Sequence, residues 1–180
     1  MNATVVGASG YSGRELVSLL LSHPQVNLVG VTSRSLCGQK VQSSIPKLRG
    51  KAQDLTFTNP SITELAENPD CDIFFLALPH GTSATYAIPL LEAGKKVIDL
   101  SADFRLNSPE AYEEFYGTPH PSPDWLIKAS YGLPEIHSLS WTNSSLIASP
   151  GCYPTSIIVP LFPILKDGLI EKNNIIANSL

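Results

Sequence analysis

One cysteine of this sequence stands where a side chain could do covalent chemistry. Cys152 follows a short apolar run, residues 146–148, which predicts the end of a strand, and it precedes a segment with apolar residues at helical spacing. Gly151 permits a tight turn, and Pro154 fits the first turn of a helix. A thiol there meets unpaired backbone N–H groups and the positive end of the helix dipole, which favour the nucleophilic thiolate. We therefore expect a reactive Cys152, the alternative being a buried, inert cysteine.

A second candidate site lies near the N-terminus, in a loop rich in glycine. Its glycines have the spacing G-x-x-G-x-x-G, a variant of the dinucleotide-binding fingerprint. The loop follows a β-prone run, residues 2–6, and precedes a predicted helix, residues 14–22, so it can hold a pyrophosphate at a helix N-terminus. The alternative is a glycine turn with no ligand. The predicted cofactor-binding residues of this loop are Gly7, Ala8, Ser9, Gly10, Tyr11, Ser12 and Gly13.

The residues after the second predicted strand indicate which nicotinamide cofactor binds. An acidic residue would bind the ribose hydroxyls of NAD, but Ser33 and Arg34 stand here, about 20 residues after the last glycine. A hydroxyl and a guanidinium suit the 2′-phosphate of NADP. We therefore predict NADP, bound by Ser33 and Arg34, against the alternative that Arg34 is a solvated loop residue.

Further candidates follow the later strands of the predicted sheet. The apolar run at residues 73–78 is typical of a strand buried in a parallel sheet, and residues 95–100 form the next strand. In such sheets, the loops beyond the carboxyl ends of the strands line the ligand crevice. The residues that we expect to contact the cofactor from these loops are Leu78, Pro79, His80 and Ser101.

Several polar side chains in these loops have two possible roles. His80 could carry a proton, or it could hold a position or cap a helix. Asp103 and Arg105 share one loop, which suggests either substrate recognition or an internal ion pair. We take Arg105, together with Tyr153 beside the cysteine, as candidate substrate contacts.

The order of the predicted elements is typical of an α/β fold. Strands and helices alternate along the chain, which predicts a Rossmann-type, mostly parallel sheet with helices on both faces. We assign residues 1–149 to this NADP-binding domain. Residues 174–178 are predicted to form a further strand.

Composition argues against several classes of function. The net charge of −4 at pH 7 provides no basic surface for nucleic acid. No apolar segment has the length of a membrane span. The three cysteines form no C-x-x-C pair, so we expect no structural metal and a reduced, cytoplasmic setting.

Five runs of the sequence together point to a known family. They are VVGASGYSG at residues 5–13, LALPHG at 76–81, DLSADFR at 99–105, YGLPE at 131–135 and PGCYPT at 150–155. In this order they resemble the N-acetyl-gamma-glutamyl-phosphate reductase family, NADPH enzymes of arginine biosynthesis related to aspartate-semialdehyde dehydrogenase. The last run is similar to the family's active-site signature, and its cysteine falls on Cys152.

The resemblance implies a reaction and an incomplete chain. The Cys152 thiolate would attack N-acetyl-glutamyl 5-phosphate, release phosphate and leave a thioester, which NADPH reduces to N-acetyl-glutamate 5-semialdehyde. The family continues into an α+β catalytic and dimerisation domain, whose beginning we assign to residues 150–180. That domain carries a catalytic histidine, and none of the four histidines of this sequence follows Cys152. We therefore expect these residues to be insufficient for turnover, and the full-length protein to be a homo-oligomer.

Two other functions stay open at this point. Aspartate-semialdehyde dehydrogenase, or another acyl-phosphate reductase, would have the same fold, and a substrate panel would separate them. A nucleotide-binding module without catalysis predicts ordinary reactivity at Cys152, whereas an enzyme predicts selective alkylation there. We also expect an exposed apolar surface where the second domain would pack.

Overall fold

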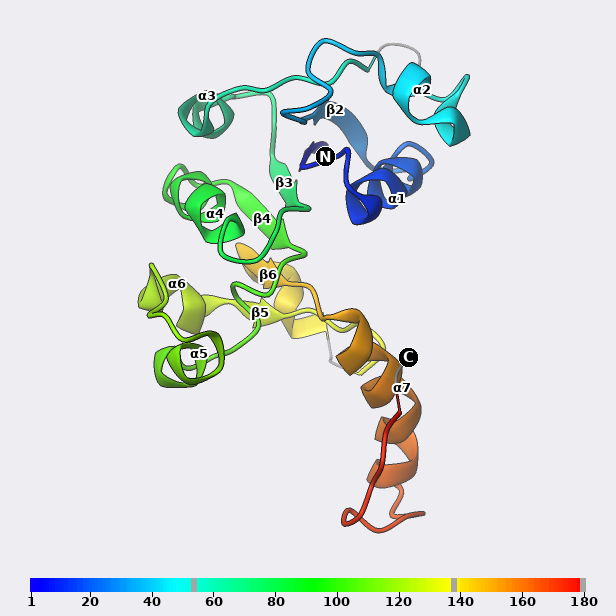
Figure 1. Ribbon diagram of the computed structural model, residues 1–180, viewed down its shortest axis with the longest axis vertical. Coiled ribbons are helices and arrows are strands. Elements are labelled where there is room, and N and C mark those ends of the chain that lie inside the picture. The colour runs from blue at the N-terminus through cyan, green and yellow to red at the C-terminus, as the bar shows by residue number, and fades with distance from the viewer. Residues whose placement is uncertain (53–54, 137–138, 179–180) are drawn as a thin grey trace.

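A six-stranded sheet forms the centre of the protein, as seen in the computed structural model, which describes residues 1–52, 55–136 and 139–178 (Figure 1). The strand order is β2-β1-β3-β4-β6-β5, and each neighbouring pair is parallel. The predicted Rossmann-type sheet is thereby confirmed. The strands are β1 (Asn2–Val6), β2 (Asn27–Val31), β3 (Ile73–Leu76), β4 (Lys96–Asp99), β5 (Ser130–Tyr131) and β6 (Leu146–Ala148).

Helices cover both faces of this sheet, as predicted (Figure 1). One face carries α1 (Tyr11–Leu20) and α2 (Val41–Ser44). The other carries α3 (Ile62–Glu67), α4 (Ser83–Glu92), α5 (Pro109–Tyr116) and α6 (Pro123–Lys128). Two short 3-10 helices, Pro46–Leu48 and Leu139–Asn143, lie in the connections.

Strand β3 holds the two helical layers together because its side chains alternate between the two faces. Phe74 and Leu76 are fully buried in the cluster that includes Leu90 of α4. Phe75 packs against the opposite cluster, which includes Val17 of α1. Each such burial contributes about 1.5–3 kcal/mol. A strand that is buried on both faces has a continuous apolar run in its sequence, and this is why β3 could be predicted.

Because the strands are parallel, the loops that follow β1, β3, β4 and β6 meet at one edge of the sheet. Backbone hydrogen bonds continue past the strand ends and fix how these loops start. The N–H of Ala77 donates to Val6 O over 2.8 Å, and the N–H of Ser149 donates to Asp99 O over 2.8 Å. The candidate residues of all four loops are thus brought to the same edge.

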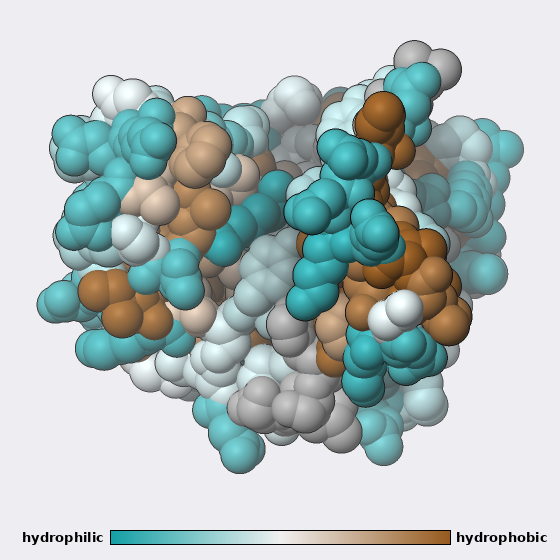
Figure 2. Space-filling view, turned by 90° about the horizontal axis from the view of Figure 1, so that it is seen from below, coloured by the Kyte–Doolittle hydropathy of each residue, from teal (hydrophilic) through white to brown (hydrophobic). Residues whose placement is uncertain are grey.

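The C-terminal part of the chain leaves the layered body. Helix α7 (Cys152–Lys166) points away from the sheet and contains no buried residue, and the chain after it runs back beside it (Figure 1). Figure 2 views the molecule from below, the end at which α7 lies, and shows apolar side chains gathered on that face. The exposed apolar side chains of this part include Tyr153, Ile158, Phe162, Leu169, Ile170, Ile175 and Ile176.

The prediction of a strand over residues 174–178 is wrong. These residues have no regular secondary structure, and no strand among the described residues pairs with them. A strand needs a hydrogen-bonding neighbour, which an apolar run in the sequence cannot guarantee. Within the same described ranges, no helix combines the length and apolarity that crossing a membrane requires.

Candidate active site

The loop between β1 and α1 is fixed between two neighbouring strands. Gly7 has a φ of +83°, and a Cβ at this position would clash with the carbonyl oxygen of Ala77, just after β3. On the other side, the Thr32 hydroxyl accepts from the Gly7 N–H over 3.2 Å, and the Thr32 carbonyl accepts from the Ala8 N–H over 2.9 Å. The side chain of Ala8 is buried, so this predicted residue offers only its backbone to the site.

Gly13 allows the start of α1 to lie directly against this loop. A Cβ at Gly13 would stand 2.5 Å from Gly7 O and 2.8 Å from the Cα of Ala8. The first N–H groups of a helix have no partner within the helix, so the close approach leaves donors beside the loop. Such a helix start binds phosphate groups well.

A groove of about 440 Å³ runs from the glycine loop to the loop after β3. It brings together most of the predicted cofactor residues. Ala77 and Leu100 also line it and were not predicted, although the place of each directly after a strand was a usable signal. The lining residues are Gly7, Ser9, Gly10, Tyr11, Ser12, Gly13, Ala77, Leu78, Pro79 and Leu100.

Beyond Thr32, the residues after β2 contact the glycine loop through a hydrogen bond of Ser33. Ser33 Oγ donates to Ser9 Oγ over 2.8 Å, which places Ser33 beside the groove. Arg34 is exposed and does not line the groove itself. Arg14 was not predicted: its Nε donates to Ser9 O over 2.8 Å, and it lines a smaller hollow on this side of the loop. A basic residue directly after the last glycine was the signal for it.

His80 faces the loop after β4 instead of the groove. Its Nδ1 lies 2.7 Å from Asp103 Oδ1, and its ring lies 4.2 Å, centroid to centroid, from that of Tyr116 on α5. Of the two roles considered for His80, these contacts fit the positioning role. Asp103 therefore pairs with His80, and no ion pair joins it to Arg105 in the described part of the chain.

Ser101 is buried between the carboxylate of Asp99 and the backbone of Asp103. Its Oγ donates to Asp99 Oδ2 over 2.7 Å and accepts from the backbone N–H of Asp103 over 3.0 Å. Burial raises the pKa of the Asp99 carboxyl, and hydrogen bonds from Ser83 and Ser101 oppose that shift. The Ser101 side chain is thus occupied within the protein and does not line the groove.

Arg105 connects the loop after β4 to the turn before Cys152. Its Nε donates to Ser149 O and its Nη2 to Leu100 O, both over 2.8 Å. A Cβ on Gly151 would stand 2.9 Å from Arg105 Nη1. The guanidinium therefore packs against the turn itself, and the glycine makes room for it.

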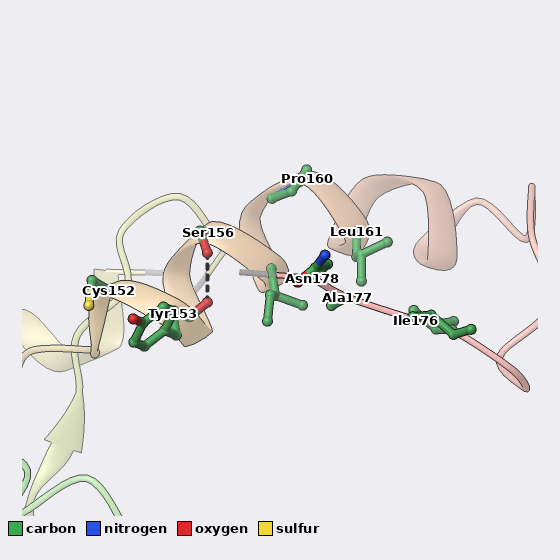
Figure 3. Close-up of a pocket in the computed structure, with 10 residues that line it drawn as sticks. Cys152, Tyr153, Ser156, Pro160, Leu161, Ile176, Ala177 and Asn178 are labelled. Atoms are coloured by element: carbon green, nitrogen blue, oxygen red, sulfur yellow. Dashed lines mark hydrogen bonds between the residues drawn. The ribbon is translucent and has the colours of Figure 1, made fainter. Parts of the chain in front are cut away.

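Cys152 is the first residue of α7 and is exposed, so the predicted strand-to-helix turn is confirmed. The N–H and hydroxyl of Thr155 both donate to Gly151 O, over 3.0 and 2.8 Å, and close the first turn. A hollow of about 690 Å³ opens beside the cysteine. Figure 3 shows its wall, made by Cys152, Tyr153, Ser156, Pro160 and Leu161 with residues 176–178 beside the helix.

No metal centre accompanies these groups: among the described residues, no three His, Cys, Asp or Glu side chains gather where they could hold an ion. Of the three cysteines, Cys37 and Cys152 are exposed and Cys71 is buried.

Comparison with known proteins identifies the domain. The family described as "Semialdehyde dehydrogenase, NAD binding domain" matches residues 2–143. The N-acetyl-gamma-glutamyl-phosphate reductase of Akkermansia muciniphila is 46% identical over 180 residues, which is 99% of this chain and 52% of the relative. That of Desulfotalea psychrophila is 48% identical over 175 residues, which is 97% of this chain and 49% of the relative. The chain thus spans about half the length of the curated relatives it matches.

Solved structures agree on the fold. Aspartate semialdehyde dehydrogenase II of Vibrio cholerae, complexed with ASA, matches with a TM-score of 0.64 and 21% identity over 92% of this chain and 46% of that one. The aspartate semialdehyde dehydrogenase of Candida albicans, with NADP, gives a TM-score of 0.63 and 17% identity over the same shares. At sequence identities this low, the comparison shows that the two structures share the fold of this chain and nothing more.

Gly13→Ala tests the close approach of α1 to the glycine loop. Alanine inside a helix normally adds up to about 1 kcal/mol of stability. Here the added methyl meets backbone atoms that no rotamer change can move, so we expect the free energy of unfolding to fall by about 1–3 kcal/mol in urea denaturation. Gly10→Ala is the control, because the nearest atom to its Cβ lies 3.6 Å away. Gly10 is the N-cap of α1, where alanine is less favourable than glycine, so we expect a loss of about 0.5 kcal/mol that is smaller than the loss in Gly13→Ala. Equal losses in both variants would contradict the packing described.

Proposed function

This chain belongs to the semialdehyde dehydrogenase NAD-binding domain family, and from that premise we propose that it binds NADPH and supplies Cys152 as the nucleophile of an N-acetyl-gamma-glutamyl-phosphate reductase. One observation carries the proposal. The nucleotide groove and the Cys152 turn lie at the same edge of the sheet, and Arg105 joins the turn to Leu100 of the groove. The names of relatives 43–48% identical to this chain support the substrate, N-acetyl-glutamyl 5-phosphate.

The glycine loop has the tight packing expected of a dinucleotide-binding loop, which supports a nucleotide in the groove. A Cβ at Gly7 would collide with Ala77 O, and a Cβ at Gly13 would collide with Gly7 O. The pyrophosphate would lie over this loop and the start of α1, with Ser33 and Arg34 at the 2′-phosphate end. Leu78 and Pro79 would contact the nicotinamide half. NADPH supplies the hydride when it is bound.

Cys152 would carry the acyl group. Its thiolate attacks the acyl carbon, the bond to the phosphate oxygen breaks, and a thioester forms on Sγ while phosphate leaves. Reduction of the thioester releases the aldehyde and returns the thiolate. Backbone N–H groups at the start of α7 would stabilise the negative oxygen of each tetrahedral intermediate. Arg105, which packs against the turn before the cysteine, and Tyr153, which follows the cysteine, would contact or position the substrate.

We further propose that residues 1–149 form the NADP-binding domain and that residues 150–180 begin a catalytic domain. The absence of buried residues in α7, and the exposed apolar side chains around it, support a second domain packed against this helix. That domain would provide the acid/base histidine and the contacts of a homo-oligomer. We propose a cytoplasmic setting for this biosynthetic enzyme.

A second candidate reaction is that of aspartate-semialdehyde dehydrogenase, whose structures share the fold. The PGCYPT and SADFR runs and the names of the curated relatives favour the acetylglutamyl substrate. A polypeptide that extends through the second domain should reduce N-acetyl-glutamyl phosphate, and preference for aspartyl phosphate would reverse the assignment.

Titration calorimetry tests the cofactor. We expect this chain to bind NADPH more tightly than NADH, because Arg34 and Ser33 bind the 2′-phosphate. Arg34→Ala should weaken NADPH binding about tenfold, the value of one charge-assisted hydrogen bond, and leave NADH binding unchanged. Arg49→Ala, an exposed arginine far along the chain from the glycine loop, is the matched control. An Arg34→Ala protein that still prefers NADPH would contradict this assignment.

Alkylation tests the nucleophile, and the chain contains its own control. Cys37 and Cys152 are both exposed and unpaired, but only Cys152 begins a helix of 15 residues. We expect iodoacetamide to modify Cys152 faster than Cys37, as followed by peptide mass spectrometry. Equal rates would favour a nucleotide-binding module without catalysis. Cys152→Ser should abolish the fast phase and leave NADPH binding intact.

A further inference from the structure

A buried carboxylate holds the loop that follows β3. The side chain of Asp103 is 0% exposed and has three partners, all in residues 80–84. Oδ1 accepts from the Gly81 N–H over 2.7 Å and lies 2.7 Å from His80 Nδ1, and Oδ2 accepts from the Ala84 N–H over 2.9 Å. A charge this deeply buried is tolerated only when its oxygens have such partners.

These bonds replace a local cap that α4 lacks. Thr82, which precedes the helix, makes no capping bond with its side chain. The first N–H groups of a helix need an acceptor, and a negative charge is favoured there by the helix dipole. Asp103, in the loop after β4, supplies both the acceptor and the negative charge. It therefore connects this loop to the loop after β3.

The fixed segment adjoins the groove directly. Leu78 and Pro79 line the groove, and His80 follows them. The segment is held at its start by the bond from Ala77 N–H to Val6 O and at its end by Asp103. Ser83 Oγ also donates to Asp99 Oδ1, but without Asp103 the backbone N–H groups of Gly81 and Ala84 would lose their acceptor.

We propose that Asp103 is a positioning residue for the cofactor: its carboxylate sets the conformation of residues 78–84 that the nicotinamide half of NADPH contacts. The inference rests on the proposed function. Asp103 does not line the groove, so it acts through the loop and not by touching the cofactor. Arg105, two residues further on, holds Ser149 in the turn before Cys152. Residues 103–105 therefore contact both the loop that would hold the cofactor and the turn that precedes Cys152.

Asp103→Asn tests this with two ligands of different reach. Asparagine keeps the size of the side chain but offers one acceptor oxygen in place of two.

Adenosine 2′,5′-bisphosphate contains only the adenine end of NADPH, which would lie over the glycine loop and Arg34. We expect the variant to bind NADPH about tenfold more weakly, the value of one charge-assisted hydrogen bond. Its affinity for adenosine 2′,5′-bisphosphate should stay within about twofold of the wild type, because that half does not reach residues 78–84. Asp124→Asn, an exposed change of the same charge, should alter neither affinity.

Equal losses for both ligands would show a general structural role and overturn the proposal, and so would an unchanged NADPH affinity. A wild-type chain that binds neither ligand would instead overturn the proposed function. If Asp103→Asn does not fold, amide hydrogen exchange of the wild type decides. We expect NADPH to slow exchange in residues 78–84 and in residues 101–105, which do not line the groove, whereas protection of the first segment alone would contradict the coupling.

Discussion

The structure depends on one constraint: at the carboxyl edge of a parallel sheet, several strands end together and their loops must satisfy one another's polar groups. The segment after β4 does most of this. Asp99 accepts from Ser83 and Ser101, Asp103 accepts from the start of α4, and Arg105 donates to two backbone carbonyls. Loops that would otherwise be independent are therefore tied to one strand.

This arrangement would bring the two proposed kinds of chemistry to one place. In the proposed function, the glycine loop after β1 binds phosphate groups, and the turn after β6 presents an exposed thiol at a helix start. Both segments are anchored to their neighbours by backbone hydrogen bonds that extend the sheet. The proposed nucleotide and the proposed covalently bound substrate would then be held in a fixed relation without a long flexible connection.

Sequence patterns were sufficient where local chemistry decides the conformation. The apolar run of β3, the spacing of Gly7, Gly10 and Gly13, and the Gly151–Cys152 turn each require particular residue types, and the structure has them as expected. The partners of Asp103 and Arg105 could not be read in the same way. The expected alternatives were substrate recognition or an ion pair between them. The ion pair is absent from the described residues, since Asp103 binds residues 80–84 and Arg105 binds Ser149 and Leu100, and the substrate contact of Arg105 stays a prediction. Such contacts join segments far apart in sequence and depend on strand order. The failed strand at residues 174–178 has the same cause, because pairing needs a neighbour that the pattern does not specify.

The most direct measurement is a crystal structure of this chain grown with NADP⁺. The central claim is that the nucleotide groove and Cys152 form one site. We predict the pyrophosphate over the glycine loop and the nicotinamide ring beyond Leu78 and Pro79, on the side of the Cys152 thiol. A nucleotide bound away from the glycine loop, or one whose nicotinamide ring points away from Cys152, would contradict it.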